Sequence, residues 1–248
     1  MEQLNSTREI VNRLQKEILH LQGIKTPSSA AVRTFGLGPI EAAFPNSVFP
    51  TGALHEFINH APEHAAASGA FIAGLLQTLM QQGAACLWIG TSRTLFPPSL
   101  TAFGVAPDRI IFIDLKKEKD VLWATEEALK CEGLAAVIAE VQDMSLTQSR
   151  RLQLAAEKSG VTGMILRNQA SKMMTTACVA RWQIKPISSA AEDGMPGVGL
   201  PRWEVSLLKV RNGNPGQWEI EWAASGFHPV TAHDVAHLRP IHPLKTGS

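Results

Sequence analysis

The residues best suited to chemistry lie close together near position 60, beginning with the pair His55-Glu56. A zinc-protease motif, H-E-x-x-H, needs a second histidine four residues after the first, so that both side chains reach the metal from one helix face. That position is Asn59, and Pro62 follows in a stretch that has the pattern of a strand and then a loop. Because the helical pair of ligands is missing, the sequence predicts no metal site here.

Other catalytic patterns lack the partners that they require. His233 and His237 have the four-residue spacing of metal ligands, but no third ligand accompanies them. The three cysteines, Cys86, Cys131 and Cys178, are isolated in apolar runs, and none has a histidine partner suited to activate a thiol. The chain has no Gly-x-Ser-x-Gly elbow. We therefore expect no metal, no covalent catalysis and no disulfide framework.

The composition is typical of a globular protein of a reducing compartment. Of the 248 residues, 45% are hydrophobic and 18% charged, and 23 Lys+Arg against 22 Asp+Glu leave a formal net charge of +1. This balance excludes a polybasic partner surface as the dominant feature. No apolar run approaches the roughly 20 residues of a membrane helix, and the N-terminus lacks the pattern of a secretion signal. We expect a cytoplasmic protein that does not bind membranes.

Short apolar runs alternate with helical patterns from residue 52 onward. Strands that alternate with helices of about 12 residues are typical of parallel βαβ units, whose strands are buried on both faces. We therefore expect an α/β fold with a mostly parallel sheet flanked by helices. The predicted strands span residues 52–58, 84–89, 110–115, 134–141 and 162–166, and the predicted helices span 62–82, 97–103, 118–131 and 146–158.

The pattern changes after residue 178. Residues 178–187, 203–210 and 217–222 are strand-like and have no helix between them. The run Asn-Gly-Asn-Pro-Gly at 212–216 is typical of a tight turn. We expect the sheet to end in a C-terminal antiparallel hairpin, after a mobile loop over residues 188–201.

The chain divides into four predicted parts. These are an amphipathic N-terminal helix over residues 1–22, a proline-rich linker over 23–48, an α/β domain over 49–226 and a flexible tail over 227–248. The helix carries one apolar stripe, which either packs on the chain's own domain or docks on a partner or a second copy. The stripe consists of Leu4, Val11, Leu14, Ile18 and Leu21.

The order of these elements resembles the RecA-like ATPase core. A Pro-Thr-Gly turn at 50–52 precedes the first strand, and residues 85–105, with Pro97 and a terminal Phe-Gly-Val, resemble the second strand and the helix that follows it. The strand that ends in Asn168 and Gln169 resembles the one whose terminal Asn-Gln senses the γ-phosphate in that family. The resemblance covers residues 49–222 and implies a RecA-like fold.

The residues that hold phosphate in such ATPases are missing. A phosphate loop, G-x-x-x-x-G-K-[ST], uses glycine amides to cradle the phosphates, a lysine to offset their charge and a hydroxyl to hold Mg²⁺. The corresponding run at 59–67 reads Asn-His-Ala-Pro-Glu-His-Ala-Ala-Ala, so the lysine falls on an alanine in either register. We therefore expect no nucleotide cofactor and no enzymatic activity. The degenerate phosphate loop comprises Glu63, His64, Ala65, Ala66 and Ala67.

Other functional positions of the RecA-like core also differ. Ser92 stands where the family has the glutamate that activates water, and Glu140 replaces the aspartate that supports the metal. The two loops that bind DNA in recombinases correspond to the short stretches 142–145 and 170–176. A single-strand groove needs basic residues interleaved with stacking groups, which these stretches do not supply. We expect DNA binding to be weak or indirect.

Two segments carry a narrower resemblance. Residues 202–222 contain the pattern Leu-Leu-Lys-x-Arg-x-Gly-x-Pro-Gly-x-Trp-Glu, which is similar to the C-terminal hallmark of the ImuA family, a SulA/RecA-like group of the bacterial SOS response. Residues 49–56 resemble its other hallmark. The resemblance implies a non-catalytic accessory of error-prone translesion DNA synthesis and DNA repair. It also implies two kinds of partner, a RecA-type recombinase filament and a Y-family-like polymerase homologue or an error-prone polymerase subunit.

Two pairs of residues near the hairpin are candidates for partner contacts. Lys209 and Arg211 end a strand where RecA-like ATPases place basic residues that reach a neighbour's γ-phosphate, so they are either a trans-acting basic pair or a solvated hairpin end. Trp218 and Trp222 are four apart in a strand and point to one face. That face is either a partner interface, if it is exposed, or part of the core.

Two other functions stay open from the sequence. A SulA-like division inhibitor would use the same fold to bind a tubulin-like GTPase. An atypical ATPase would bind nucleotide through a phosphate loop of unusual sequence.

Overall fold

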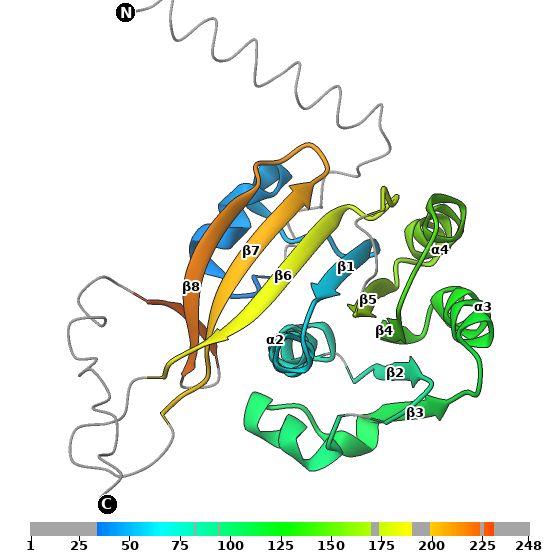
Figure 1. Ribbon diagram of the computed structural model, residues 1–248, viewed down its shortest axis with the longest axis horizontal. Helices are drawn as coiled ribbons and strands as arrows, with labels where there is room; N and C mark the ends of the chain where they lie inside the picture. Colours follow the sequence, from blue (N-terminus) through cyan, green and yellow to red (C-terminus); the bar gives the residue numbers. More distant parts are fainter. Residues whose placement is uncertain are drawn as a thin grey trace, which may run out of the picture. The chain divides into compact units, whose positions relative to one another are not determined.

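The computed structural model describes residues 34–81, 83–93, 95–169, 174–189, 199–223 and 226–230. Within these ranges, nine strands form one sheet in the order β3-β2-β4-β5-β1-β6-β7-β8-β9 (Figure 1). The strands are β1 Leu54–Asn59, β2 Ala85–Gly90, β3 Ile110–Asp114, β4 Leu134–Val141, β5 Thr162–Asn168, β6 Ala180–Ile187, β7 Arg202–Val210, β8 Gly216–Ala223 and β9 Gly226–Pro229.

The first half of the sheet is parallel, as the alternation of strands and helices predicts. In the order β3, β2, β4, β5, β1 and β6, each strand pairs in parallel with the next. All six residues of β1 are buried, including the polar side chains of His55, Glu56 and Asn59, because the strand is covered on both faces. The carboxyl ends of β2, β4, β5 and β1 therefore meet at one edge of the sheet.

Three helices cover the parallel strands: α2 over Pro62–Leu79, α3 over Glu118–Leu129 and α4 over Leu146–Ser159. Figure 1 shows α3 and α4 on one face of these strands and α2 on the other. The start of α4 is fixed by a capping box between Ser145 and Gln148, and its end by Gly160 in the left-handed conformation. The short helix expected over 97–103 is a 3₁₀ helix, η3 Pro97–Phe103.

The second half of the sheet is antiparallel from β6 to β9. β7 and β8 form the predicted hairpin. The prediction of a flexible tail over 227–248 is wrong for its first residues. β9 extends to Pro229, and the side chain of Phe227 is 5% exposed. Phe227 packs against Trp222 with ring centroids 4.9 Å apart, so it belongs to the core of the domain.

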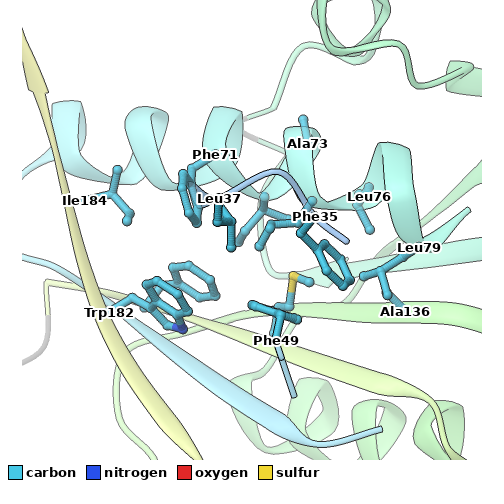
Figure 2. Close-up of a cluster of buried hydrophobic side chains, with 14 of the residues drawn as sticks. Phe35, Leu37, Phe49, Phe71, Ala73, Leu76, Leu79, Ala136, Trp182 and Ile184 are labelled. Carbon is cyan, nitrogen blue, oxygen red and sulfur yellow. The ribbon is translucent and has the colours of Figure 1, made fainter. Parts of the chain in front are cut away.

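The prediction of a linker over 23–48 also differs from the structure for residues 34–48, which are the part of this segment that the structure describes. Residues 34–48 form two short 3₁₀ helices, η1 Gly38–Ala43 and η2 Pro45–Ser47, and the side chains of Phe35, Leu37 and Ile40 are buried. Figure 2 shows Phe35 and Leu37 in one cluster with Phe49, between α2 and the strands. The prolines of this segment break helical periodicity without preventing burial, which is why its packing could not be recognised from the sequence.

Several expectations lie outside the described residues. These are the amphipathic helix over 1–22 with its apolar stripe, most of the loop over 188–201, and the tail after Val230. In the part of the chain that the structure describes, no helix is long and apolar enough to cross a membrane.

Candidate functional site

A cleft of about 790 Å³ opens at the carboxyl edge of the parallel strands. Its lining includes Thr91 and Ser92 after β2, Val141 and Gln142 at the end of β4, and residues 168–169 at the end of β5. Ligands of open α/β sheets bind at this edge, where the strands end and loops begin. The cleft is therefore the candidate functional site.

The connection from β1 to α2 borders the cleft. β1 ends at Asn59 and α2 begins at Pro62, so only His60 and Ala61 join them. A phosphate loop wraps its ligand with several successive backbone amides, for which two residues are too few. The five residues predicted for a degenerate phosphate loop instead lie in the first two turns of α2. Of these five, Ala65 and Ala66 line the cleft.

A chain of hydrogen bonds connects four strands and α2 at the floor of the cleft. The Oγ–H of Ser68 donates to Oδ1 of Asn59 (2.7 Å), whose Nδ2–H donates to Oδ1 of Asn168 (2.9 Å). Asn168 donates through Nδ2 to Oε2 of Glu140 (3.3 Å), and Trp88 donates through Nε1 to Oε1 of the same carboxylate (2.6 Å). The asparagine that resembles a γ-phosphate sensor thus bonds to neighbouring protein groups.

Two carboxylates line the cleft, Glu140 and Glu118. Glu118 accepts a hydrogen bond from the backbone N–H of Gln142. Among the described lining residues, none is a lysine, an arginine or a histidine. Two like charges would repel the phosphates of a nucleotide, and no lining cation would offset the repulsion. Ser92 lies at the same edge and carries no carboxylate.

The walls of the cleft are apolar. The wall from α2 has only small side chains, those of Ala65, Ala66, Gly69, Ala70 and Ala73. The opposite wall is larger and consists of Leu95, Phe96, Leu100 and Phe103, from η3 and the residues before it. The ring of Phe96 is 68% exposed although it borders the cleft. The arrangement is a cleft with two apolar walls and a polar floor that includes two carboxylates.

A buried ion network lies beside the cleft and was not predicted from the sequence. The carboxylate of Glu56 is fully buried; it accepts from Arg167 Nη1 (2.9 Å) and from Arg181 Nε (2.7 Å), and also from the hydroxyl of Thr176. Arg167 in turn pairs through Nη2 with Asp143 (2.7 Å). These residues come from β1, β5, β6 and two loops, so the network cannot be recognised from any local sequence pattern.

His55, the neighbour of Glu56, is not a metal ligand but a core residue. Its ring stacks on Phe49 with centroids 4.5 Å apart, and Nδ1 accepts from Trp182 Nε1 (3.3 Å). Complete burial lowers the pKa of His55 from 6.5 to about 4, although its hydrogen bond to the Pro50 carbonyl opposes this shift. Among the described residues, no group of three or more His, Cys, Asp or Glu side chains could hold a metal ion.

Lys209 and Arg211 lie at the end of β7, as predicted, and both contact the segment before β6. Lys209 Nζ donates to the carbonyl of Thr176 (2.8 Å), and Arg211 Nη2 donates to that of Ala177 (2.8 Å). Arg211 also pairs with Glu157 of α4 (3.2 Å). In this structure, the two cations therefore hold the β5–β6 connection, and neither lines the cleft.

Trp218 and Trp222 share one face of β8, as their spacing predicts, but that face is turned inward. Trp222 is 5% exposed and donates its Nε1–H to the carbonyl of Ala102 (3.1 Å). Trp218 is partly buried and packs against the main core. Of the two alternatives for this face, the structure therefore places Trp222 in the core, because β9 and η3 cover it.

Comparisons with known proteins agree with this fold. No protein-family profile matches the chain. The crystal structure of the RadB recombinase superposes with a TM-score of 0.56 at 13% identity, covering 80% of this chain and 99% of that chain, which shows a RecA-like fold. Protein ImuA from two strains of Caulobacter vibrioides is 34% identical over 234 residues, covering 86% of this chain and 95% of the relative. With that identity over nearly the full length of both proteins, the chain belongs to the ImuA family.

Proposed function

We propose that this chain is a non-hydrolysing RecA-like accessory of the SOS response, which takes part in error-prone translesion DNA synthesis by contacting other proteins. The observation that carries the proposal is the site itself. In this chain, a two-residue connection and an alanine-rich helix start stand where a RecA-like ATPase holds phosphate. The lining of the cleft also contains two carboxylates. The family membership supports the pathway, and the altered site supports a role without ATP chemistry.

The partners that we propose are a RecA-type recombinase filament and a Y-family-like polymerase homologue or an error-prone polymerase subunit. We propose further that the protein is cytoplasmic and that its binding to DNA is weak or indirect. The exposed surface includes large apolar side chains outside the cleft, such as Trp123 (65% exposed) and Leu154 (56%), which are suited to protein contacts.

The nucleotide test uses the full chain and isothermal titration with Mg·ATP, with a recombinase that has an intact phosphate loop as the positive control. We expect no heat of binding at millimolar ATP and no phosphate release above the buffer rate. Micromolar binding would overturn the proposal and favour the atypical ATPase.

The partner test measures binding of the purified full chain to two separate targets from its source organism. These are a recombinase filament assembled with ATP and single-stranded DNA, and the Y-family-like polymerase homologue. We expect saturable binding to at least one. Binding to neither, together with inhibition of polymerisation of the tubulin-like division GTPase, would move the assignment to a SulA-like inhibitor.

A further inference from the structure

Two adjacent helices outside the cleft expose large apolar side chains to solvent. α3 and α4 lie side by side on one face of the parallel strands (Figure 1). Trp123 of α3 is 65% exposed and Leu154 of α4 is 56% exposed. In each helix the exposed residue follows a buried one by two positions, Val121 in α3 and Leu152 in α4. Because two positions correspond to about 200° around a helix, Trp123 and Leu154 both point away from the sheet.

An ion pair joins the outer sides of the two helices between these residues. Arg151 Nη2 of α4 lies 2.6 Å from Glu126 Oε2 of α3. Glu126 follows Trp123 by three positions, and Leu154 follows Arg151 by three positions, so each apolar residue is one turn from the ion pair. Trp123 and Leu154 therefore belong to one continuous surface and are not isolated exposed residues.

Cations lie on both sides of Leu154. Arg150 and Lys158 stand four positions before and after it, which places all three on the same side of α4. Both cations are exposed, and in the part of the chain that the structure describes neither pairs with a carboxylate. Glu157 is the acidic residue of α4, and it pairs instead with Arg211 (3.2 Å). The surface around Leu154 is therefore positively charged, which favours an acidic partner.

We call this surface the α3–α4 face, and the side chains that define it come from both helices. They are Trp123, Glu126, Arg150, Arg151, Leu154 and Lys158.

The backbone of this face decides which form of polypeptide can bind to it. Helices pair their own N–H and C=O groups, so the α3–α4 face offers no sheet edge to which an extended strand could add. An amphipathic helix needs no backbone pairing, because it binds through apolar side chains at positions i, i+3, i+4 and i+7. Such a helix packs across two others when its side-chain ridges fit between theirs.

We propose that the α3–α4 face binds an acidic amphipathic helix of a partner protein. The apolar side of that helix covers Trp123 and Leu154, and its carboxylates pair with Arg150 and Lys158. Tryptophan and arginine are the side chains that most often dominate the binding energy of protein interfaces. The inference rests on the proposed function, since it names the surface through which the chain contacts another protein.

The test titrates the full chain with three synthetic peptides of about 20 residues, a length at which a helix can form. The first peptide has leucines at i, i+3, i+4 and i+7 and glutamates elsewhere. The second has lysines in place of the glutamates, and the third has the residues of the first in an order without an apolar helix face. We expect saturable binding of the first peptide by isothermal titration and about tenfold weaker binding of the other two. No binding of the first peptide, or equal binding of all three, would overturn the proposal.

Fluorine NMR locates the bound peptide on the chain. The full chain is labelled with 5-fluorotryptophan at its six tryptophans, and the Trp123 resonance is identified by its absence from Trp123→Phe. We expect the first peptide to shift the Trp123 resonance and to leave that of Trp182, which is fully buried, unchanged. A shift confined to other resonances would place the peptide elsewhere and overturn the proposal.

Charge reversal at two sites provides a matched comparison. Arg150→Glu/Lys158→Glu and Lys116→Glu/Lys117→Glu change the net charge equally, and all four side chains are exposed, so both variants should fold. We expect the first variant to weaken binding of the acidic peptide about tenfold and the second to weaken it less than about threefold. Equal weakening would mean that net charge, and not the α3–α4 face, controls binding.

The apolar contact has its own comparison. Leu154→Ser should weaken binding of the acidic peptide about tenfold, because the peptide's leucines lose their contact with this side chain. Leu208→Ser is the control, since Leu208 is 41% exposed on β7, away from the two helices. Unchanged affinity of Leu154→Ser would remove Leu154 from the binding surface and contradict the proposal.

The proposed partners separate this inference from the proposed function. The unaltered chain, Arg150→Glu/Lys158→Glu and Leu154→Ser are each measured against the recombinase filament and the Y-family-like polymerase homologue. We expect both variants to weaken binding to at least one of these about tenfold. If the unaltered chain binds a partner and both variants bind it equally well, only this inference fails. If the unaltered chain binds neither, the proposed function fails, and the peptide titration still decides whether the α3–α4 face binds an acidic helix.

Discussion

The indole Nε1–H of Trp88 and the Oε1 of Glu140 are 2.6 Å apart, so that a carboxylate at the end of β4 accepts a hydrogen bond from β2. The other oxygen of the same carboxylate accepts from Asn168 at the end of β5. By resemblance to RecA-like ATPases, Glu140 occupies the position of a residue that supports the metal. In this structure the hydrogen bonds of Glu140 instead connect three strands. The residue therefore has a structural role at the position where RecA-like ATPases support the metal.

Trp88→Phe removes the indole donor while keeping an aromatic ring in the same place. We expect the free energy of unfolding to fall by about 2 kcal/mol, because the carboxylate loses a charge-assisted hydrogen bond. Urea unfolding followed by circular dichroism measures the change. The matched control is Trp123→Phe, whose side chain is 65% exposed and which should change stability by less than about 0.5 kcal/mol. Equal effects of the two substitutions would contradict a structural role for the bond.

Arg167→Met breaks the ion network around the fully buried carboxylate of Glu56. The expected loss of stability is about 3–5 kcal/mol, since the remaining charge stays buried with one partner fewer. Arg151→Met is the control, because Arg151 pairs with Glu126 at the surface and such a pair contributes less than about 1 kcal/mol. Thermal unfolding of both variants decides the matter. A melting temperature of Arg167→Met as high as that of the control would mean that the network contributes little.

Protonation of His55 should destabilise the fold in mild acid. Burial holds the pKa of His55 at about 4 in the folded chain, against 6.5 when it is exposed, so the unfolded chain binds more protons between these values. Stability therefore decreases as the pH falls from about 6.5 to about 4, by roughly 3 kcal/mol from this residue.

His55→Gln removes the titrating ring and provides the comparison. We expect this variant to be less stable at neutral pH, because the ring contacts Phe49 and Trp182 in the core. Its stability should nevertheless decrease less steeply between pH 6.5 and 4. Urea midpoints at several pH values measure the slope, and parallel curves for the two proteins would exclude His55 as the source.

Gly213 lies in the β7–β8 turn, where the chain passes close to η1. A Cβ at this position would lie 2.5 Å from Val210 Cγ1 and closer still to the carbonyl oxygen of Ala43. Gly213→Ala should therefore lower the free energy of unfolding by about 1–3 kcal/mol through overpacking. Gly133→Ala, where nothing lies within 4 Å of the added Cβ, should change it by less than about 1 kcal/mol. If Gly213→Ala and Gly133→Ala have the same free energy of unfolding, the turn accommodates the added Cβ without a loss of stability.

Lys209 and Arg211 are predicted to contact the nucleotide of a neighbouring recombinase subunit. Lys209→Ala/Arg211→Ala should weaken binding to the ATP-loaded filament, which sedimentation of the filament with the purified chain can measure. The same variant loses two donors to the carbonyls of Thr176 and Ala177, so a loss of about 1–3 kcal/mol in stability is also expected.

Ser149→Ala separates these two effects. The Ser149 hydroxyl accepts from the backbone N–H of Ala177, so this variant loosens the same segment without removing a cation. If only the basic pair weakens filament binding, the cations act on the partner. Equal weakening by both variants would assign the effect to the segment, and unchanged binding of the basic variant would exclude the pair.

The alternation of strands and helices and the loss of phosphate-loop residues could both be predicted from the amino-acid sequence alone. Both are local signals: buried parallel strands are continuous apolar runs, and the helices repeat their apolar positions every three to four residues. The predicted strand over 134–141 and the predicted helix start at Pro62 match β4 and α2 for this reason. The absence of a lysine near Ala65 is likewise visible in the letters alone.

Which side chains contact one another, and therefore the role of several candidate residues, depends on the three-dimensional fold. Glu56 pairs with Arg167 and Arg181, more than a hundred residues away in sequence, because β1 lies between β5 and β6. Trp222 is buried because β9 and η3 cover the inner face of β8, and the spacing of two tryptophans in a strand cannot show what lies against that face. Residue types and periods act within one element, whereas burial and ion pairing depend on strand order, which brings distant parts of the chain together.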